Sequence, residues 1–212
     1  MSYTFITSYI SLWKESNTEN YLEKEKKLKR YYIALGIYEL LEVISAIGTI
    51  ILNRFIKADA STSISIGAIS TIVLAAFLAV GLLNKSPRIC GYTYALFSLR
   101  SFLNIMISVI KGEFEVENIK GIVLIVFYIF LAYGFLNINK IKAKQYTVIA
   151  IGFYIVYGII AVIFEIFEQI NKEPTFSIVV FFSSYYIVNF IVSTIINWFI
   201  VKIIVTENEI SD

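Results

Sequence analysis

Six long apolar segments restrict the possible fold of this chain more than any other feature. They cover residues 31–55, 62–84, 89–111, 118–138, 146–169 and 176–205. Each reaches the roughly 20 residues that a helix needs to cross a hydrocarbon core of about 30 Å at about 1.5 Å per residue. Lipid offers no hydrogen-bond partners to an open backbone, so segments of this kind must be helical. The sequence therefore predicts an all-α, polytopic membrane helical bundle with about six transmembrane helices.

The composition agrees with a membrane protein. Hydrophobic residues fill 58% of the 212 positions and charged residues only 16%, and the mean hydropathy is +0.76. A water-soluble domain carries more charge, about 25% of its residues. The net charge of +2 gives no reason to expect a nucleic-acid partner. The lipid bilayer is the partner that this composition predicts.

The chain divides into a charged N-terminal arm (1–30), the six-helix transmembrane domain (31–205) and a short acidic tail (206–212). Apolar side chains recur at helical spacing in the arm, at Phe5, Ile6, Tyr9, Ile10 and Trp13. This pattern is typical of an amphipathic helix that lies in the membrane interface. The alternative is a short solvated arm that only stops translocation and sets the orientation of the first span.

Two Ser/Glu–Pro pairs mark the starts of predicted helices. Ser86 precedes Pro87, an arrangement typical of an N-cap followed by proline at the first helical position, at the start of the third span. Glu173 and Pro174 stand in the same relation to the sixth span. These are the only two prolines, so no proline kink is expected within a span.

Lysine and arginine are distributed unequally between the two sides of the predicted bundle. If the N-terminus is cytosolic, twelve fall on the cytosolic side: Lys14, Lys24, Lys26, Lys27, Lys29, Arg30, Lys85, Arg88, Lys140, Lys142, Lys144 and Lys202. Five fall on the outer side: Arg54, Lys57, Lys111, Lys120 and Lys172. Cytosolic loops of membrane proteins carry the excess of basic residues. The asymmetry predicts a multi-pass protein of the cell membrane with both termini in the cytosol.

The ends of three predicted spans resemble one another. Residues 77–84 (FLAVGLLN) align with 130–137 (FLAYGFLN), and more loosely with 190–197. After the first two copies, Tyr92-Thr93 corresponds to Tyr146-Thr147 with one residue inserted. These matches predict parallel two-helix hairpin repeats related by an axis along the membrane normal. Chance similarity between apolar helices is the alternative, especially for the third copy.

Five polar residues lie at membrane depth: Glu39 and Glu42 in the first span, Arg100 and Asn104 in the third, and Asn189 in the sixth. A charged group there costs about 2.5–3.5 kcal/mol on insertion scales unless it is paired or hydrated. Glu42 and Arg100 each follow about eleven residues of their span, which corresponds to roughly 16 Å of depth. Opposite charges at one depth predict an ion pair between them.

Two interpretations of these five residues follow. In one, the charges fix helix register and bind no ligand. In the other, they line a pathway for a solute or an ion, because intramembrane ionisable groups usually mark such paths. The second interpretation predicts a transport-type protein. The first fits a non-catalytic membrane subunit, an immunity or defence protein, or a membrane-perturbing effector, acting through a cytosolic or membrane protein partner or as a homo-oligomer.

Catalytic and cofactor motifs are missing from the sequence. The chain has no histidine, and Cys90 is its only cysteine, so His-dependent triads and Cys/His zinc sites cannot form. The only aspartates are Asp59 and Asp212, too few at membrane depth for an intramembrane aspartyl protease. We therefore expect neither an enzyme nor a resident cofactor or metal.

Overall fold

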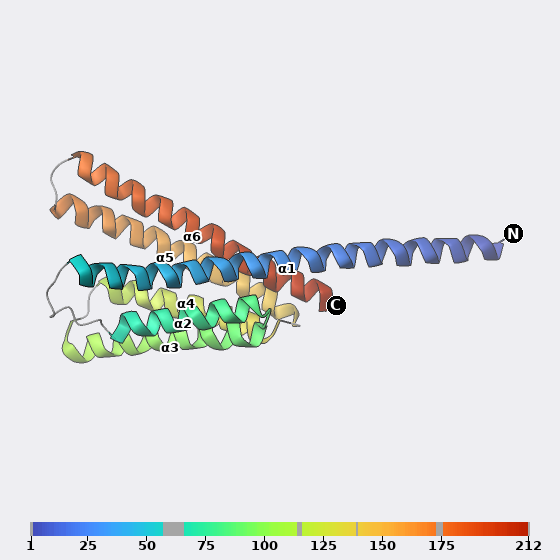
Figure 1. The fold of residues 1–212 in the computed structure, drawn as a ribbon, viewed down its shortest axis with the longest axis horizontal. Coiled ribbons are helices and arrows are strands. Elements are labelled where there is room, and N and C mark those ends of the chain that lie inside the picture. The colour runs from blue at the N-terminus through green and yellow to red at the C-terminus, as the bar shows by residue number, and fades with distance from the viewer. Residues whose placement is uncertain (1, 57–65, 114–115, 139, 173–175, 212) are drawn as a thin grey trace.

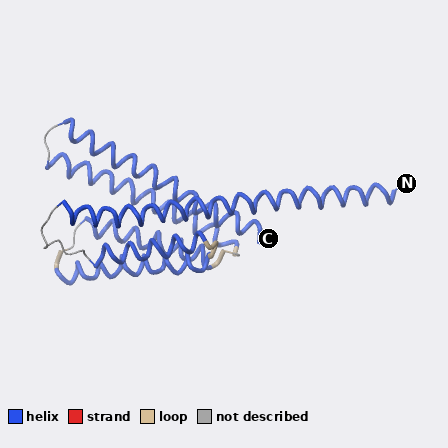
Figure 2. Tube along the Cα trace, in the orientation of Figure 1, coloured by secondary structure: helices blue, strands red, loops and turns tan. Residues whose placement is uncertain are grey.

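The computed structural model describes residues 2–56, 66–113, 116–138, 140–172 and 176–211, which form helices and short turns without any strand (Figures 1 and 2). The helices are α1 (Ser2–Ile56), α2 (Ile66–Leu83), α3 (Pro87–Lys111), α4 (Val116–Leu136), α5 (Ile141–Lys172) and α6 (Phe176–Ser211). The predicted all-α fold is thus confirmed for the described part of the chain.

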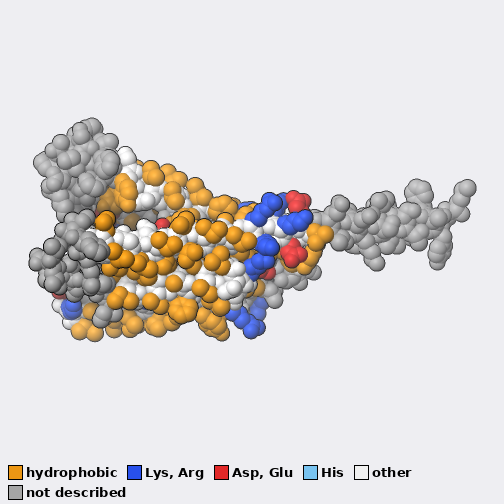
Figure 3. Space-filling view, viewed as in Figure 1, with side chains coloured by type: hydrophobic (Ala, Val, Ile, Leu, Met, Phe, Trp, Pro, Cys, Tyr) orange, Lys and Arg blue, Asp and Glu red, His pale blue; other side chains and the backbone are white. Residues whose placement is uncertain are grey.

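Five of the helices are long and apolar enough to cross a membrane. They are the helical segments Tyr21–Leu52, Pro87–Lys111, Asn118–Leu136, Lys142–Phe167 and Ser183–Ile210. The described apolar part of α2, Ala68–Leu83, is shorter, and residues 62–65 of the predicted second span lie outside the described residues. Figure 3 shows an apolar surface over the face of the bundle in view, with Lys, Arg, Asp and Glu gathered where α1 leaves it. These features indicate a multi-pass membrane protein.

The six helices form a ring in the order of the sequence. Each helix packs against the next one along the chain, and α1 packs against α6 to close the ring. Both termini lie at one end, which we call the terminal end (Figure 1). At the opposite end, called the distal end, α1, α3 and α5 end and α2, α4 and α6 begin, and α5 and α6 diverge from the other helices toward it (Figure 1).

The terminal half of the ring contains the buried core. Each helix supplies at least one side chain that is at most 1% exposed: Tyr32, Leu82, Cys90, Phe135, Ala143 and Ile203. The Tyr32 hydroxyl donates a hydrogen bond to Glu207 Oε1 at 3.1 Å, and Lys24 Nζ lies 3.1 Å from Glu209 Oε2. These two contacts join α1 to α6. The core and these contacts hold the ring together at the terminal end.

Two glycines allow neighbouring helices to approach closely in this half. A Cβ atom at Gly36 would lie 3.2 Å from the backbone nitrogen of Leu83, and one at Gly91 would lie 3.2 Å from that of Leu136. Small residues permit such close packing of membrane helices. Leu83 and Leu136 hold matching positions in the aligned segments described above, so one contact recurs between α1–α2 and α3–α4. Superposition of whole hairpin repeats stays a prediction.

The start of α3 follows the predicted capping pattern. Ser86 is the N-cap, its hydroxyl accepts a hydrogen bond from the amide nitrogen of Ile89 at 3.5 Å, and Pro87 is the first helical residue. Gly112 ends the helix in the left-handed conformation, with φ of 73°. The corresponding start of the sixth helix cannot be compared, because residues 173–175 lie outside the described residues.

The arm and the first span belong to one helix. α1 runs without a break from Ser2 to Ile56 and projects far beyond the bundle (Figure 1), so the predicted boundary at residue 30 falls within a continuous helix. The stretch from residue 2 to residue 35 contains no glycine or proline, and a Glu23–Lys27 ion pair of 2.7 Å supports the helix at i,i+4 spacing. The side chains of residues 2–20 are outside the described part, so the amphipathic pattern stays a prediction. Similarly, α6 continues through residues 206–211 instead of ending at 205.

Candidate functional site

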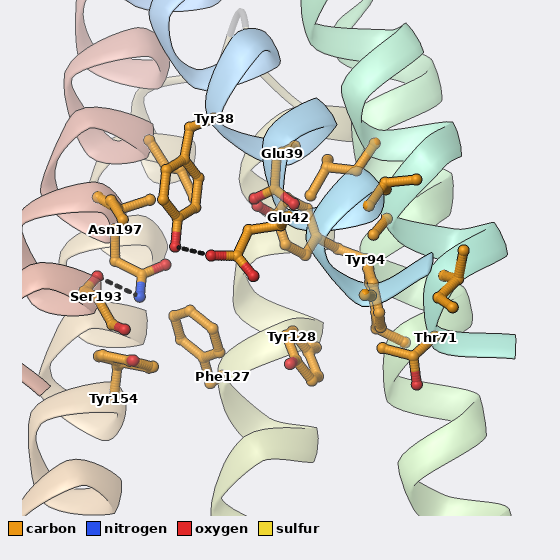
Figure 4. Close-up of a pocket in the computed structure, with 18 residues that line it drawn as sticks. Tyr38, Glu39, Glu42, Thr71, Tyr94, Phe127, Tyr128, Tyr154, Ser193 and Asn197 are labelled. Carbon is orange, nitrogen blue, oxygen red and sulfur yellow. Dashed lines mark hydrogen bonds between the residues drawn. The ribbon is translucent and has the colours of Figure 1, made fainter. Parts of the chain in front are cut away.

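A cavity of about 340 Å³ lies inside the ring, on the distal side of the core. All six helices contribute to its wall (Figure 4). Its polar and aromatic lining consists of Tyr38, Glu39, Glu42, Thr71, Tyr94, Phe97, Phe127, Tyr128, Tyr154, Ser193 and Asn197. We call it the central cavity. In Figure 3, acidic atoms are visible in a hollow within the apolar surface.

Two carboxyl groups from α1 project into the central cavity. Glu39 and Glu42 are three residues apart, so the helix places both on one face, and Figure 4 shows them side by side. Glu42 Oε1 accepts a hydrogen bond from the Tyr38 hydroxyl at 3.0 Å. Among the described residues, Glu39 has no hydrogen bond and no ion pair. One of the two carboxyl groups therefore faces the cavity without a partner among the described residues.

Aromatic rings form the wall on α3, α4 and α5. Tyr128 stacks on Tyr94 and on Phe97, with ring centroids 6.2 and 5.4 Å apart, and Phe127 meets Tyr154 at 5.0 Å. Tyr94 is only 4% exposed, and its hydroxyl makes no hydrogen bond within the described part of the chain. Stacked rings of this kind are rigid, so they hold the shape of the cavity.

The α6 side of the cavity is polar but uncharged. Asn197 Nδ2 donates a hydrogen bond to the backbone oxygen of Ser193 at 3.0 Å (Figure 4). Neither lysine nor arginine occurs among the residues that line the cavity. Among the described residues of its wall, the two glutamates are thus the only charged side chains, and no described basic residue there offsets them.

A second cavity, of about 260 Å³, lies between α5 and α6. It shares Tyr154 and Ser193 with the central cavity and also includes Asn189 and Glu165. Glu165 Oε1 lies 3.5 Å from Lys120 Nζ of α4, and the two side chains are 26% and 11% exposed. The shared residues place the two cavities next to each other. Polar groups thus continue from Glu39 and Glu42 along α5 and α6 to this ion pair.

The structure separates the five predicted site residues into three groups. Glu39 and Glu42 line the central cavity, and Asn189 lines the second cavity. Arg100 and Asn104 line neither, and Asn104 is exposed.

The predicted ion pair between Glu42 and Arg100 is wrong. Arg100 Nε instead donates a hydrogen bond to Ser70 Oγ of α2 at 2.9 Å, whereas Glu42 accepts one from Tyr38. The reason is the order of the ring, in which α2 lies between α1 and α3. Equal depth did not bring the two side chains together.

Sequence reasoning missed most of the uncharged lining of the cavity. Tyr94, Tyr128 and Tyr154 resemble other apolar span residues in the sequence, although a hydroxyl in the middle of a span is itself a polar group. Asn197 was considered only as the end of the aligned segment 190–197. The signal that could have found these residues is the depth of their polar groups, which matches that of the glutamates.

Comparisons with known proteins add no family to these observations. No protein-family model matches the chain, and neither curated proteins nor solved structures give a significant match. Within the described residues, no group of three or more Cys, Asp or Glu side chains could hold a metal ion. The geometry of the cavities therefore carries the functional argument.

Proposed function

We propose that this chain is a transport-type membrane protein that binds a small solute in the central cavity. The observation that carries the proposal is a cavity lined by all six helices into which Glu39 projects without a partner among the described residues. A volume of about 340 Å³ falls within the range of about 300–1,000 Å³ typical of small-molecule sites.

The lack of an opposite charge beside Glu39 and Glu42 among the described residues favours this function over a purely structural role. A structural charge at membrane depth is expected to pair with an opposite charge, because an unpaired one costs about 2.5–3.5 kcal/mol. Glu42 instead bonds a neutral phenol from its own helix, and Glu39 bonds no described residue. The Tyr38–Glu42 bond stays within α1 and Glu39 bonds no described residue, so neither carboxyl group links two helices among the described residues. A hydrated or ligand-bound site accounts better for both carboxyl groups.

We infer that all six helices cross the cell membrane, with the terminal end in the cytosol. The excess of basic residues at that end supports this orientation, and the common location of both termini agrees with an even number of spans (Figure 1). The eighteen residues of α2 extend about 27 Å, a little less than a hydrocarbon core of about 30 Å. A short span of this kind is accommodated by local thinning of the bilayer.

The packing favours access to the cavity from the distal side. The buried core lies between the cavity and the terminal end, whereas α5 and α6 diverge toward the distal end (Figure 1). The described chain contains no soluble domain that could supply energy from nucleotide hydrolysis. Transport would therefore be passive, driven by a gradient, or dependent on a partner.

A second candidate function is that of a non-catalytic subunit acting through a protein partner. The observation that favours it is the part of α1 that projects beyond the bundle (Figure 1). Residues 2–20 alone extend about 28 Å at 1.5 Å per residue. A helix of this length at the proposed cytosolic side offers a docking surface for a cytosolic protein.

Thiol labelling tests whether the central cavity holds water and on which side it opens. In a Cys90→Ala background, Ser193→Cys is expected to react with a small membrane-impermeant thiol reagent added outside intact cells, because Ser193 lines both cavities. Val188→Cys on the same helix is the control, since Val188 lines neither cavity and its 57% exposure is toward lipid in this arrangement. The extent of labelling is measured by mass spectrometry.

Two outcomes would contradict the proposal. If Ser193→Cys were as unreactive as Val188→Cys, the cavity would be dry and the charges structural. If Ser193→Cys reacted only after permeabilisation, as Lys202→Cys is expected to do, the opening would face the cytosol and the orientation would be wrong.

A further inference from the structure

We propose that the ligand of the central cavity is a small organic cation with an apolar body, such as a quaternary ammonium compound. The inference rests on the proposed solute-binding function and adds the chemical class of the solute. Three features of the cavity support it: its charge, its aromatic wall and its size.

The charge of the lining selects against anions. Among the described residues of the wall, Glu39 and Glu42 are the only charged groups, and no described lysine or arginine lines it. An anion would enter next to two carboxyl groups without a basic group in the described lining, and like charges brought together in this way disfavour binding. A cation would supply the opposite charge that Glu39 lacks among the described residues.

The aromatic wall suits a cation that carries little hydration. Tyr94, Phe97, Phe127 and Tyr128 line the cavity on the side formed by α3 and α4. The faces of such rings attract ammonium groups, and aromatic cages bind quaternary ammonium ligands in this way. The hydroxyl of Tyr94 is an independent sign of a ligand, because this side chain is 4% exposed and bonds no described residue. The ligand is thus expected to offer Tyr94 either a polar group or bound water.

The size and donor set of the cavity disfavour a bare metal ion. Ca²⁺ takes six to eight oxygen ligands and Mg²⁺ six, whereas the described lining offers only two carboxyl groups, and its other oxygens belong to neutral side chains such as Thr71, Ser193 and Asn197. A volume of about 340 Å³ is that of a small organic ligand site. An apolar body fills this space, and the cationic group lies between the rings and the glutamates.

Binding of three related probes to the full-length protein in detergent tests the inference by isothermal titration calorimetry. They are benzyltrimethylammonium, choline, and dimethylbutanol, in which carbon replaces the charged nitrogen of choline. Choline is expected to bind at least about tenfold more tightly than dimethylbutanol, because only choline offers a positive charge to the two carboxyl groups. Benzyltrimethylammonium is expected to bind more tightly than choline because its ring adds apolar contact.

Matched substitutions assign the binding to the glutamates. Glu39→Gln and Glu42→Gln should each weaken binding of benzyltrimethylammonium at least about tenfold. Glu25→Gln removes the same charge from an exposed position of the same helix and should leave binding unchanged. Because Glu39 bonds no described residue, Glu39→Gln should keep the thermal midpoint of the parent, which separates lost binding from lost folding.

The outcomes separate this inference from the proposed function. Equal binding of choline and dimethylbutanol, or binding unaffected by both glutamine substitutions, would overturn the cation assignment and leave a solute site. Absence of binding by all three probes while Ser193→Cys is labelled would also overturn the cation assignment alone. If Ser193→Cys is not labelled either, the proposed function fails as well.

Discussion

Gly91→Leu is expected to lower the free energy of unfolding by about 3 kcal/mol or more, the upper range for overpacking a tight contact. A Cβ at this position would lie 2.7 Å from Leu136 Cγ and 3.2 Å from the Leu136 backbone nitrogen. The Leu136 side chain can rotate away, but its backbone cannot, so α3 and α4 must separate. Gly91→Ala should cause a smaller loss, about 1–3 kcal/mol.

The matched control for this prediction is Gly152→Leu. Gly152 lies in α5, and no neighbouring atom falls within 4 Å of a Cβ built there. The substitution should be neutral or slightly stabilising, because leucine favours a helix over glycine by up to about 1 kcal/mol. The thermal midpoints of all three variants are measured by heating the protein in detergent and quantifying the soluble fraction by size-exclusion chromatography. Equal midpoints for Gly91→Leu and Gly152→Leu would show that α3 and α4 do not pack as described.

Lys120→Met is expected to destabilise the protein by about 3 kcal/mol, the lower end of the range for removing one partner of a buried ion pair. Lys120 Nζ lies 3.5 Å from Glu165 Oε1 and joins α4 to α5. The effect falls at the lower end because the Glu165 side chain is still 26% exposed, so solvent reaches the carboxylate that is left behind.

A double substitution separates the contribution of the Lys120–Glu165 ion pair to stability from losses that are due to altered packing. Lys120→Met with Glu165→Leu should recover part of the lost stability, since the Glu165 carboxylate is then no longer left behind without Lys120. Lys144→Met removes an exposed lysine of α5 and should change stability by no more than about 0.5 kcal/mol. Strictly additive losses from the two single substitutions would show that the two side chains do not interact.

The existence of the helices could be predicted from the sequence because lipid offers the backbone no hydrogen-bond partners, so a spanning segment must form its own. Apolar segments of more than about 20 residues must be helical in a bilayer, and the start of α3 followed from the capping pattern at Ser86 and Pro87. The continuity of α1 was not predicted. The change from charged to apolar residues near position 30 suggested a boundary, although no glycine or proline interrupts the helix there.

The arrangement of the site could be predicted only in part, because sequence position gives depth but not direction. Helical rise predicted a similar depth for Glu42 and Arg100, and the structure places Glu39 and Glu42, but not Arg100, in the lining of the central cavity. Helical rise could not show that α2 separates α1 from α3 or that Arg100 turns toward Ser70. Which faces of the helices point inward depends on packing between all six, and this is also why the tyrosines of the wall were missed.

Cross-linking of α1 to α6 tests most directly whether the six helices enclose the cavity. The rings of Tyr31 and Phe199 lie 5.7 Å apart. In a Cys90→Ala background with a protease site inserted after Gly112, the Tyr31→Cys/Phe199→Cys pair, treated with a short bis-maleimide, should hold the two cleaved halves together on a denaturing gel.

The control pair is Tyr31→Cys with Val148→Cys, because Val148 is exposed on α5 and α1 and α5 are not neighbours in the ring. A closed ring predicts that cleaved halves stay joined only for the Tyr31/Phe199 pair. If the halves separated for both pairs, α1 would not meet α6, and the cavity around Glu39 and Glu42 would not be enclosed.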